Sequence, residues 1–214
     1  QVTLGGVISG AGAFTQAGNG KTIFTADNAY TGVTTLDDGT LQIGDNTSTG
    51  AIASTSLVND ATLIFKRSSD LIAPFTISGS GSVEQAGDSK LTFTSNNTYT
   101  GITTISDGQL QVGNNSSAGG VGTGDISIAD GSKLIVNRNN GYDIAAIISG
   151  DGQLQKLGAG TLTLRGNNTY TGGTDFDAGT IVVRHNNALD TQQLAMAGGT
   201  ELLLEHNASI ANAI

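Results

Sequence analysis

The most conspicuous polar motif of the chain is Asn-x-Tyr-Thr-Gly, which occurs three times at nearly equal intervals. If a repeat spans three coils, the three copies should lie on one face about 14 Å apart. Exposed amides and tyrosine rings would then form a stripe that binds a glycan or a protein. The residues of this hypothetical interaction face are Asn28, Tyr30, Asn97, Tyr99, Asn168 and Tyr170. We favour the alternative interpretation as turn chemistry, in which Asn bonds nearby backbone, Gly supplies positive φ and Tyr packs over the corner.

Acidic residues recur at expected turns, where a carboxylate-based enzyme could use them. They are Asp38, Asp107 and Asp177, with Asp60 and Asp130 in similar positions before strands. A polysaccharide lyase would need several of them on one face around Ca²⁺. Asp38 and Asp107 are three expected coils apart, too far to share a ligand shell of about 2.4 Å. Tight Asp-Gly turns are therefore the better interpretation.

No other pattern indicates a catalytic, cofactor or metal site. Residues 119–125 resemble the Gly-Gly-x-Gly-x-Asp calcium repeat, but Gly124 stands where Asp is required and no tandem copy follows. His185 and His206 are one expected coil apart, and two His without a third ligand make a weak zinc site. The chain has no Cys, and no nucleophile or phosphate-loop motif is present. We expect no enzyme activity, no cofactor and no metal.

Composition narrows the class of protein. The chain has 214 residues, 32 Gly, one Pro and a formal net charge of −9. Only 13% of the residues are charged, against about 25% in an average domain, which excludes a highly charged disordered tail. The acidity argues against a nucleic-acid partner. No apolar run approaches the roughly 18 residues of a membrane span, so we expect any export signal or anchor to lie outside these residues.

Internal repeats decide the architecture. The string Ile-Ser-Gly-x-Gly begins at Ile8, Ile77 and Ile148, and its intervals in residue number, 69 and then 71, are those of the Asn-x-Tyr-Thr-Gly motif. We therefore divide the chain into one segment with three repeats, approximately 8–76, 77–147 and 148–214. A finer series of apolar anchors advances in residue number by 20, 27, 24, 20, 27 and 21: Leu63, Val83, Leu110, Leu134, Leu154, Ile181 and Leu202.

Alternation of apolar and polar residues, bounded by Gly, Asn and Asp, predicts short strands and little helix. Two further strands are expected at 91–93 and 162–164, whereas residues 207–214 stay unassigned. A strand unit that recurs at the spacing of these anchors is typical of a β-solenoid, here of about nine coils. Three repeats are too few for a propeller. A sandwich stays open, but it gives no reason for the repetition.

Residues 150–183, from Gly-Asp-Gly-Gln-Leu-Gln to Ala-Gly-Thr-Ile-Val-Val, closely resemble the autotransporter-associated β-strand repeat of passenger domains in Gram-negative type V secretion. Residues 79–112 resemble a second copy and residues 10–43 a weaker first one. Departures are small: Gln-Ala-Gly at 16–18 and 85–87 replaces the Lys-Leu-Gly of 156–158, and Thr-Asp-Phe at 174–176 replaces a Thr-Thr-apolar run.

The resemblance implies an all-β, right-handed parallel β-helix that is exported, passed through its own C-terminal outer-membrane barrel and displayed on the cell surface. The signal peptide and the barrel are not in this sequence. We expect an adhesive stalk whose partners are a host extracellular-matrix protein, a glycan or another copy of itself. A segment that promotes secretion and folding of a distal effector is the alternative, and a polysaccharide-active β-helical enzyme is a weaker one.

Overall fold

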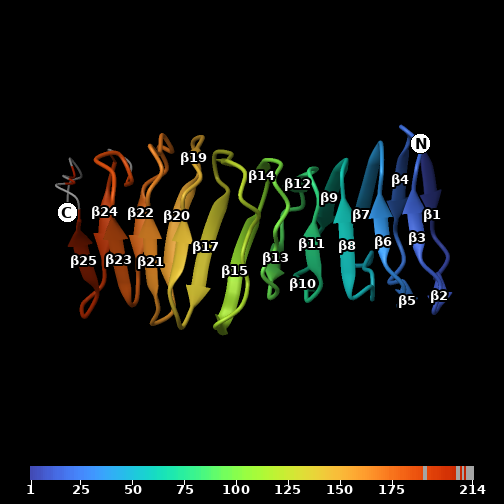
Figure 1. Cartoon of the computed structure of the whole chain (residues 1–214), viewed down its shortest axis with the longest axis horizontal. Helices are drawn as coiled ribbons and strands as arrows, with labels where there is room; N and C mark the ends of the chain where they lie inside the picture. Colours follow the sequence, from blue (N-terminus) through green and yellow to red (C-terminus); the bar gives the residue numbers. More distant parts are fainter. Residues whose placement is uncertain (190–191, 206–207, 209, 211–214) are drawn as a thin grey trace.

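The computed structural model describes residues 1–189, 192–205, 208 and 210, and every regular element in this part of the chain is a β-strand. It therefore holds no helix that is long and apolar enough to cross a bilayer. The unassigned segment 207–214 and His206 lie largely outside the described residues. The strands stack in parallel into a β-solenoid of about ten turns, with the two termini at opposite ends of the rod (Figure 1).

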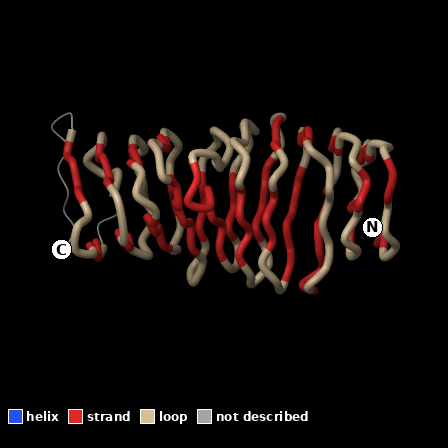
Figure 2. Tube along the Cα trace, turned by 90° about the horizontal axis from the view of Figure 1, so that it is seen from below, coloured by secondary structure: helices blue, strands red, loops and turns tan. Residues whose placement is uncertain are grey.

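The rod has three faces, and the chain visits them in the order 1, 2, 3 in each coil. Figure 2 shows the coils side by side along the rod, with strands separated by loops and turns. Face 1 is one eight-stranded sheet: β1 (Val2–Leu4), β4 (Lys21–Phe24), β7 (Thr40–Thr47), β9 (Thr62–Arg67), β12 (Ser82–Gln85), β14 (Thr103–Ile105), β16 (Ile126–Ile128) and β19 (Ile148–Ser149).

Face 2 begins with a two-stranded sheet, β2 (Ser9–Gly10) and β5 (Ala29–Tyr30). The parallel bridge between Asp27 and Ala51 carries it onward to a seven-stranded sheet. That sheet consists of β10 (Leu71–Ala73), β13 (Lys90–Phe93), β15 (Gln109–Ser116), β17 (Lys133–Arg138), β20 (Gln153–Leu157), β22 (Thr174–Phe176) and β24 (Leu194–Met196).

Face 3 consists of two four-stranded sheets that follow one another along the rod. The first holds β3 (Phe14–Gln16), β6 (Thr34–Leu36), β8 (Ser56–Asn59) and β11 (Thr76–Ser78). The second holds β18 (Tyr142–Ile144), β21 (Thr161–Leu164), β23 (Thr180–Val183) and β25 (Glu201–Leu204). Between them the bridge from Asn96 to Gly120 continues the ladder. The sequence prediction of an all-β parallel solenoid is thus confirmed.

Alternate side chains of each strand point into one continuous core. In β9, Leu63 and Phe65 are buried, whereas Thr62, Ile64 and Lys66 between them are partly exposed. Leu63 stacks on Leu41 of the coil before and on Val83 of the coil after, and the ring of Phe65 packs edge-on against Phe93 with centroids 6.0 Å apart. Burying one such side chain contributes about 1.5–3 kcal/mol, so the core accounts for the period-2 pattern of the sequence.

The long sequence repeat does not contain a whole number of coils. The ladder that starts at Leu41 reaches Thr103 after three coils, by way of Leu63 and Val83. Leu110, the counterpart of Leu41 in the second repeat, follows Thr103 by seven residues. It belongs to β15 on face 2, whereas Leu41 belongs to β7 on face 1. One repeat therefore spans three and a third coils and turns by a third of a revolution.

The third repeat continues this screw. The face 2 ladder of Leu110 passes through Leu134 and Leu154 to Thr174, again three coils. Ile181, the next counterpart, lies seven residues later in β23 on face 3. The two longest steps in the anchor series, Val83 to Leu110 and Leu154 to Ile181, therefore each consist of one full coil and the passage to the next face. Equivalent residues of the three repeats lie on three different faces, and the expectation of one common face is wrong.

The two motifs that mark each repeat are stacked neighbours in successive coils. Ser9 pairs with Ala29 and Gly10 with Tyr30, which sets each Ile-Ser-Gly-x-Gly string beneath an Asn-x-Tyr-Thr-Gly string. The final glycines of the two motifs meet: a Cβ on Gly101 would lie 2.3 Å from the carbonyl oxygen of Gly81. The motif glycine is therefore required because two backbones touch there.

We expect Gly101→Ala to lower the free energy of unfolding by about 1–3 kcal/mol, because the methyl group has to push two coils apart. Gly141→Ala is the matched control, since a Cβ at Gly141 meets no atom within 4 Å and needs no unusual φ. Its effect should stay within about 0.5 kcal/mol. Urea unfolding followed by circular dichroism measures both variants, and equal midpoints for the two would contradict the close packing of the motifs.

Candidate functional site

The asparagine of each Asn-x-Tyr-Thr-Gly motif is a buried clamp between coils. Asn97 accepts a hydrogen bond at Oδ1 from the N–H of Ile77 in the coil before (2.8 Å) and donates from Nδ2 to the carbonyl of Gly120 in the coil after (2.8 Å). Asn28 and Asn168 bond the equivalent coils in the same way. Each side chain satisfies backbone groups that the turn leaves without strand partners.

The tyrosine of the motif is also interior. Tyr30, Tyr99 and Tyr170 are at most 1% exposed. Each phenol is hydrogen-bonded over 2.7 Å to the hydroxyl of a threonine four residues later. Burial raises the pKa of Tyr99 well above its usual range. The rings pack inside the core at the corners of the coils, so they cannot stack against a ligand.

The predicted interaction face made of these six residues is therefore corrected. All six are buried, so a partner cannot contact their side chains on the folded rod. They also lie at three faces: Asn28 precedes β5 on face 2, the segment after Asn97 bonds to β11 on face 3, and the segment after Asn168 bonds to β19 on face 1. The structure supports the interpretation as turn chemistry.

A second buried polar position recurs at 16, 85 and 156, where the repeats differ in sequence. The side-chain amide of Gln85 donates to the carbonyls of Gly87 (2.8 Å) and Ser89 (3.0 Å) in the turn that follows. Lys156 takes this place in the third repeat and donates from Nζ to three carbonyls at 2.6–3.0 Å. It is 1% exposed, and burial lowers its pKa to about 8. The ammonium thus acts as a substitute for an amide.

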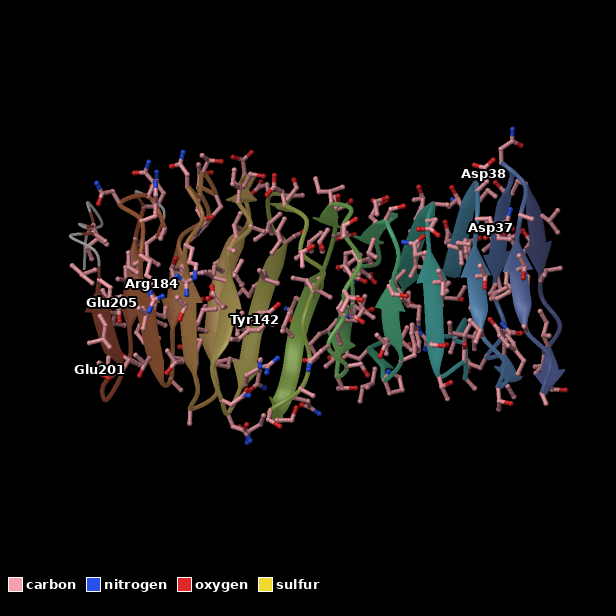
Figure 3. All side chains as sticks on the ribbon, viewed as in Figure 1. Asp37, Asp38, Tyr142, Arg184, Glu201 and Glu205 are labelled. Atoms are coloured by element: carbon pink, nitrogen blue, oxygen red, sulfur yellow. The ribbon has the colours of Figure 1, made fainter. Side chains whose placement is uncertain are left out.

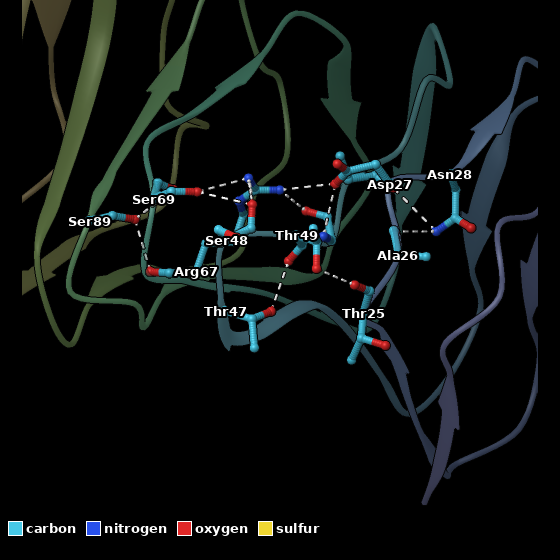
Figure 4. Close-up of polar contacts among 12 residues, drawn as sticks. Thr25, Ala26, Asp27, Asn28, Thr47, Ser48, Thr49, Arg67, Ser69 and Ser89 are labelled. Carbon is cyan, nitrogen blue, oxygen red and sulfur yellow. Dashed lines mark hydrogen bonds and ion pairs between the residues drawn. The ribbon is translucent and has the colours of Figure 1, made fainter.

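Two buried arginines hold residues 44–50 and 113–119, which comprise the irregular ends of β7 and β15 and the residues that follow them. Arg67 donates to the carbonyls of Gly50 (2.6 Å) and Ser48 and contacts Asp27 at 3.3 Å (Figure 4). Arg138 binds the second segment equivalently, through the carbonyls of Ser117 (2.5 Å) and Gly119. A guanidinium with several donors suits a turn of free carbonyls. Hydrogen bonds from Arg67 and Arg138 to backbone carbonyls therefore hold these two segments against the rod.

The acidic turn residues behave as the sequence predicts. The carboxylates of Asp38 and Asp107 accept hydrogen bonds from the N–H of the next glycine, at 2.7 and 2.8 Å. Those glycines have φ of 75° and 63°. Charged side chains elsewhere pair locally, as Arg184 and Glu205 do at 2.7 Å near the C-terminal end (Figure 3). Within the described ranges no three His, Cys, Asp or Glu side chains form a group that could hold a metal ion.

The glycine run 119–125 has a structural explanation. A Cβ on Gly122 would lie 2.0 Å from the carbonyl oxygen of Tyr99 and 2.6 Å from its ring, so the run lets the chain pass over a buried tyrosine. Beside it lies an apolar hollow of about 110 Å³ lined by Val121, Tyr142 and Ile144 among others. It is far smaller than a site for a drug-sized ligand. A larger, polar hollow lies between residues 130–133 and 151–153.

Comparison of the sequence with known proteins finds a repeat family and an autotransporter adhesin. Residues 14–43, 83–112 and 154–183 match the family model described as passenger-associated-transport-repeat. The chain is similar to the adhesin BmaC autotransporter of Brucella suis biovar 1 (strain 1330), with 29% identity over 236 residues. The alignment covers 79% of this chain and 7% of the relative, so the chain spans a small part of that protein's length. No solved structure matches the chain.

Each matched segment forms a self-paired unit in the structure. Residues 14–43 contain the strand pairs β3–β6 and β4–β7, one pair on face 3 and one on face 1. Residues 83–112 and 154–183 contain the corresponding pairs β12–β14 with β13–β15, and β20–β22 with β21–β23. The recurring sequence unit is thus one and a third coils that supply each other with backbone partners.

Because Asn97 satisfies backbone groups of two coils, Asn97→Ala should destabilise the rod by about 2–5 kcal/mol, the cost of leaving two buried groups unpaired. Asn114→Ala serves as control, since Asn114 is exposed at the irregular end of β15. Thermal unfolding of both variants measures the difference. An Asn97→Ala protein as stable as the parent would mean that the clamp carries no stability.

Lys156 predicts a pH-dependent stability. Its pKa is lowered to about 8 in the fold from an ordinary 10.5, so the folded chain holds fewer protons than the unfolded chain between these values. Stability from this group therefore rises from about pH 8 to 10.5 and is constant below pH 8. Relative to Lys156→Gln, which copies Gln85, the parent should gain on the order of 1–3 kcal/mol over this window in urea titrations. A parallel pH response of the two proteins would contradict this.

Proposed function

We propose that the chain, which carries three passenger-associated-transport-repeat matches and is similar to an autotransporter adhesin, forms an adhesive stalk on the surface of a Gram-negative bacterium. The stalk is tethered to the outer membrane by the barrel of the complete protein. It carries no catalytic step: its function is to project binding faces away from the cell and to hold them in fixed directions.

The observation that carries this proposal is the stacking of parallel strands around one continuous core along the rod. Face 1 alone joins eight strands from β1 to β19, and one hydrophobic cluster runs from Phe24 to Leu194. The backbone ladders join each coil to the coils next to it, and a few long side chains such as Arg67, which contacts Asp27, reach one coil further. Length can therefore be added without changing the cross-section. Such a rod resists bending because a bend would open strand pairs and core contacts together.

The outer surface supports weak, repeated contacts. A column on face 1 runs through Glu84, Thr104, Ser127 and Ser149, all partly exposed. Hydroxyl and carboxylate groups in such columns can bond a host extracellular-matrix protein, a glycan or the same surface of a second copy. Single contacts of this kind are weak, and many of them on one rod gain strength through effective concentration.

A second role is favoured by the self-paired units that the family model matches. A unit that contains both members of two strand pairs can fold from local contacts as soon as it emerges from the membrane, because few distant residues are needed. We propose that the three units also drive export and folding of the passenger, including any effector beyond this segment.

Deleting residues 77–147 in the full-length protein separates the two roles. The deletion joins equivalent positions of the first and third repeats, so the ladders can continue. The adhesive role predicts normal surface display with weaker attachment of cells to matrix proteins, glycans or one another. The export role predicts less protein at the surface. Surface labelling and cell adhesion, measured on the same cultures, distinguish them.

The control replaces residues 77–147 by a second copy of 8–76, which restores nearly the full length. Normal display and normal adhesion in both the deletion and the replacement would reduce the segment to a spacer and contradict the adhesive proposal.

A further inference from the structure

Between the first and the second repeat, the sequence changes its length at one corner. The interval from Leu57 to Ile126 is two positions shorter than the interval from Leu63 to Leu134. The two additional residues lie within 129–132, between β16 and β17, where the first repeat has only residues 60–61 between β8 and β9. The solenoid can therefore turn this corner with two residues fewer.

In the first repeat the short corner is closed by its own hydrogen bonds. Asp60 accepts bonds at Oδ1 from the N–H (2.8 Å) and the hydroxyl (3.0 Å) of Ser80 in the next coil. Asn59 donates from Nδ2 to the carbonyl of Ser82 (2.8 Å). Its polar side chains are thus occupied by the scaffold itself.

In the second repeat the longer corner leaves its polar groups open. The N–H of Ser132 bonds the carbonyl of Ala129 (3.0 Å) to close a turn, with Gly131 at φ 75°. This turn and the next coil line an open hollow of about 270 Å³. Among the described residues, no hydrogen bond or ion pair engages the Asp130 carboxylate or the Gln153 side-chain amide, which both line it.

The rest of the lining is equally suited to polar contacts. One carboxylate oxygen of Asp151 accepts a hydrogen bond from the hydroxyl of Thr171 (2.8 Å). The ammonium of Lys133 lies 3.5 Å from the carboxylate of Asp175. The floor is bare backbone at Gly152 and Gly172, because a Cβ on Gly172 would lie 2.4 Å from the Gly152 backbone. Carboxylate acceptors and amide or ammonium donors therefore face one small space from two coils.

We propose that this corner groove binds one sugar ring of a glycan. Ring hydroxyls donate to Asp130 and Asp151 and accept from Gln153 and Lys133. Sites for drug-sized ligands begin at about 300 Å³, so the smaller groove fits one ring and not an oligosaccharide. The ammonium among the carboxylates disfavours a bare cation. The assignment deepens the adhesive function proposed above and rests on it.

The third repeat supplies an internal comparison. Its turn 197–200 has the same length and closes through the same bond, from the N–H of Thr200 to the carbonyl of Ala197 (3.3 Å). Gly198 stands in place of Asp130 and Glu201 in place of Lys133. The turn shape thus belongs to the scaffold, whereas the groups that face the hollow are particular to the second repeat.

The test is a titration of the ¹⁵N-labelled chain with the methyl glycosides of glucose, galactose, mannose and N-acetylglucosamine, read by the backbone amides of Gly131 and Gly152. At least one glycoside should give saturable shifts centred on these amides, with a Kd on the order of 1 mM. Asp130→Ala and Gln153→Ala should each weaken it about tenfold. Asp88→Ala, an equal charge change at an exposed turn of another corner, should leave the Kd unchanged.

The absence of saturable shifts with all four glycosides would overturn the assignment, and so would an unchanged Kd in Asp130→Ala. Shifts at these amides with CaCl₂ but with no glycoside would also overturn it, in favour of a cation. The titration reads the groove without cells. If the titration fails but the repeat deletion still weakens adhesion, the groove alone is rejected. If the deletion leaves adhesion normal, the adhesive role itself is rejected.

Discussion

The parallel backbone ladder between successive coils is the constraint on which the rest of this structure depends. Every strand must place its N–H and C=O groups against those of the coil before and after, in a fixed register such as that of Val83 with Thr103. Whatever the corners do, the chain must return to that register. Glycine contacts, asparagine clamps and buried Gln or Lys donors are all ways to satisfy backbone groups where the ladder pauses.

This constraint explains why the repeats form a screw. The sequence unit is the length that supplies a pair of strands on each of two faces, as β3–β6 and β4–β7 do, and it begins on a new face each time it recurs. A rod built in this way distributes equivalent surfaces around its axis. A partner that recognises one repeat meets the next one a third of a turn away, which suits binding from several directions more than binding along one stripe.

Much of the fold follows from the sequence because strands and turns are local. Alternation around Leu63, the Asp-Gly turns and the strands at 91–93 and 162–164 needed no knowledge of distant contacts. The screw was missed although its signal was present. The step from Val83 to Leu110 is longer than the steps before and after it, because it includes one coil and also the passage to the next face. The hypothetical interaction face required Asn97 and Tyr99 to be exposed, as polar side chains at turns usually are, whereas the closure of three coils buries them. The polar hollow was also missed, although the lengthening of the second repeat interval marks its corner.

The most direct test of the screw uses the absence of native cysteine to place pairs of spin labels. The first pair, Asp38→Cys with Thr100→Cys, places the labels at two exposed positions of the same corner. These positions are three coils apart, which is about 14 Å along the rod. Asp38→Cys with Asp107→Cys joins sequence equivalents, which the structure places at different corners. Dipolar EPR should find the first distance clearly shorter than the second. A shorter distance between the equivalents would mean that the repeats stack in whole coils, and the screw would be wrong.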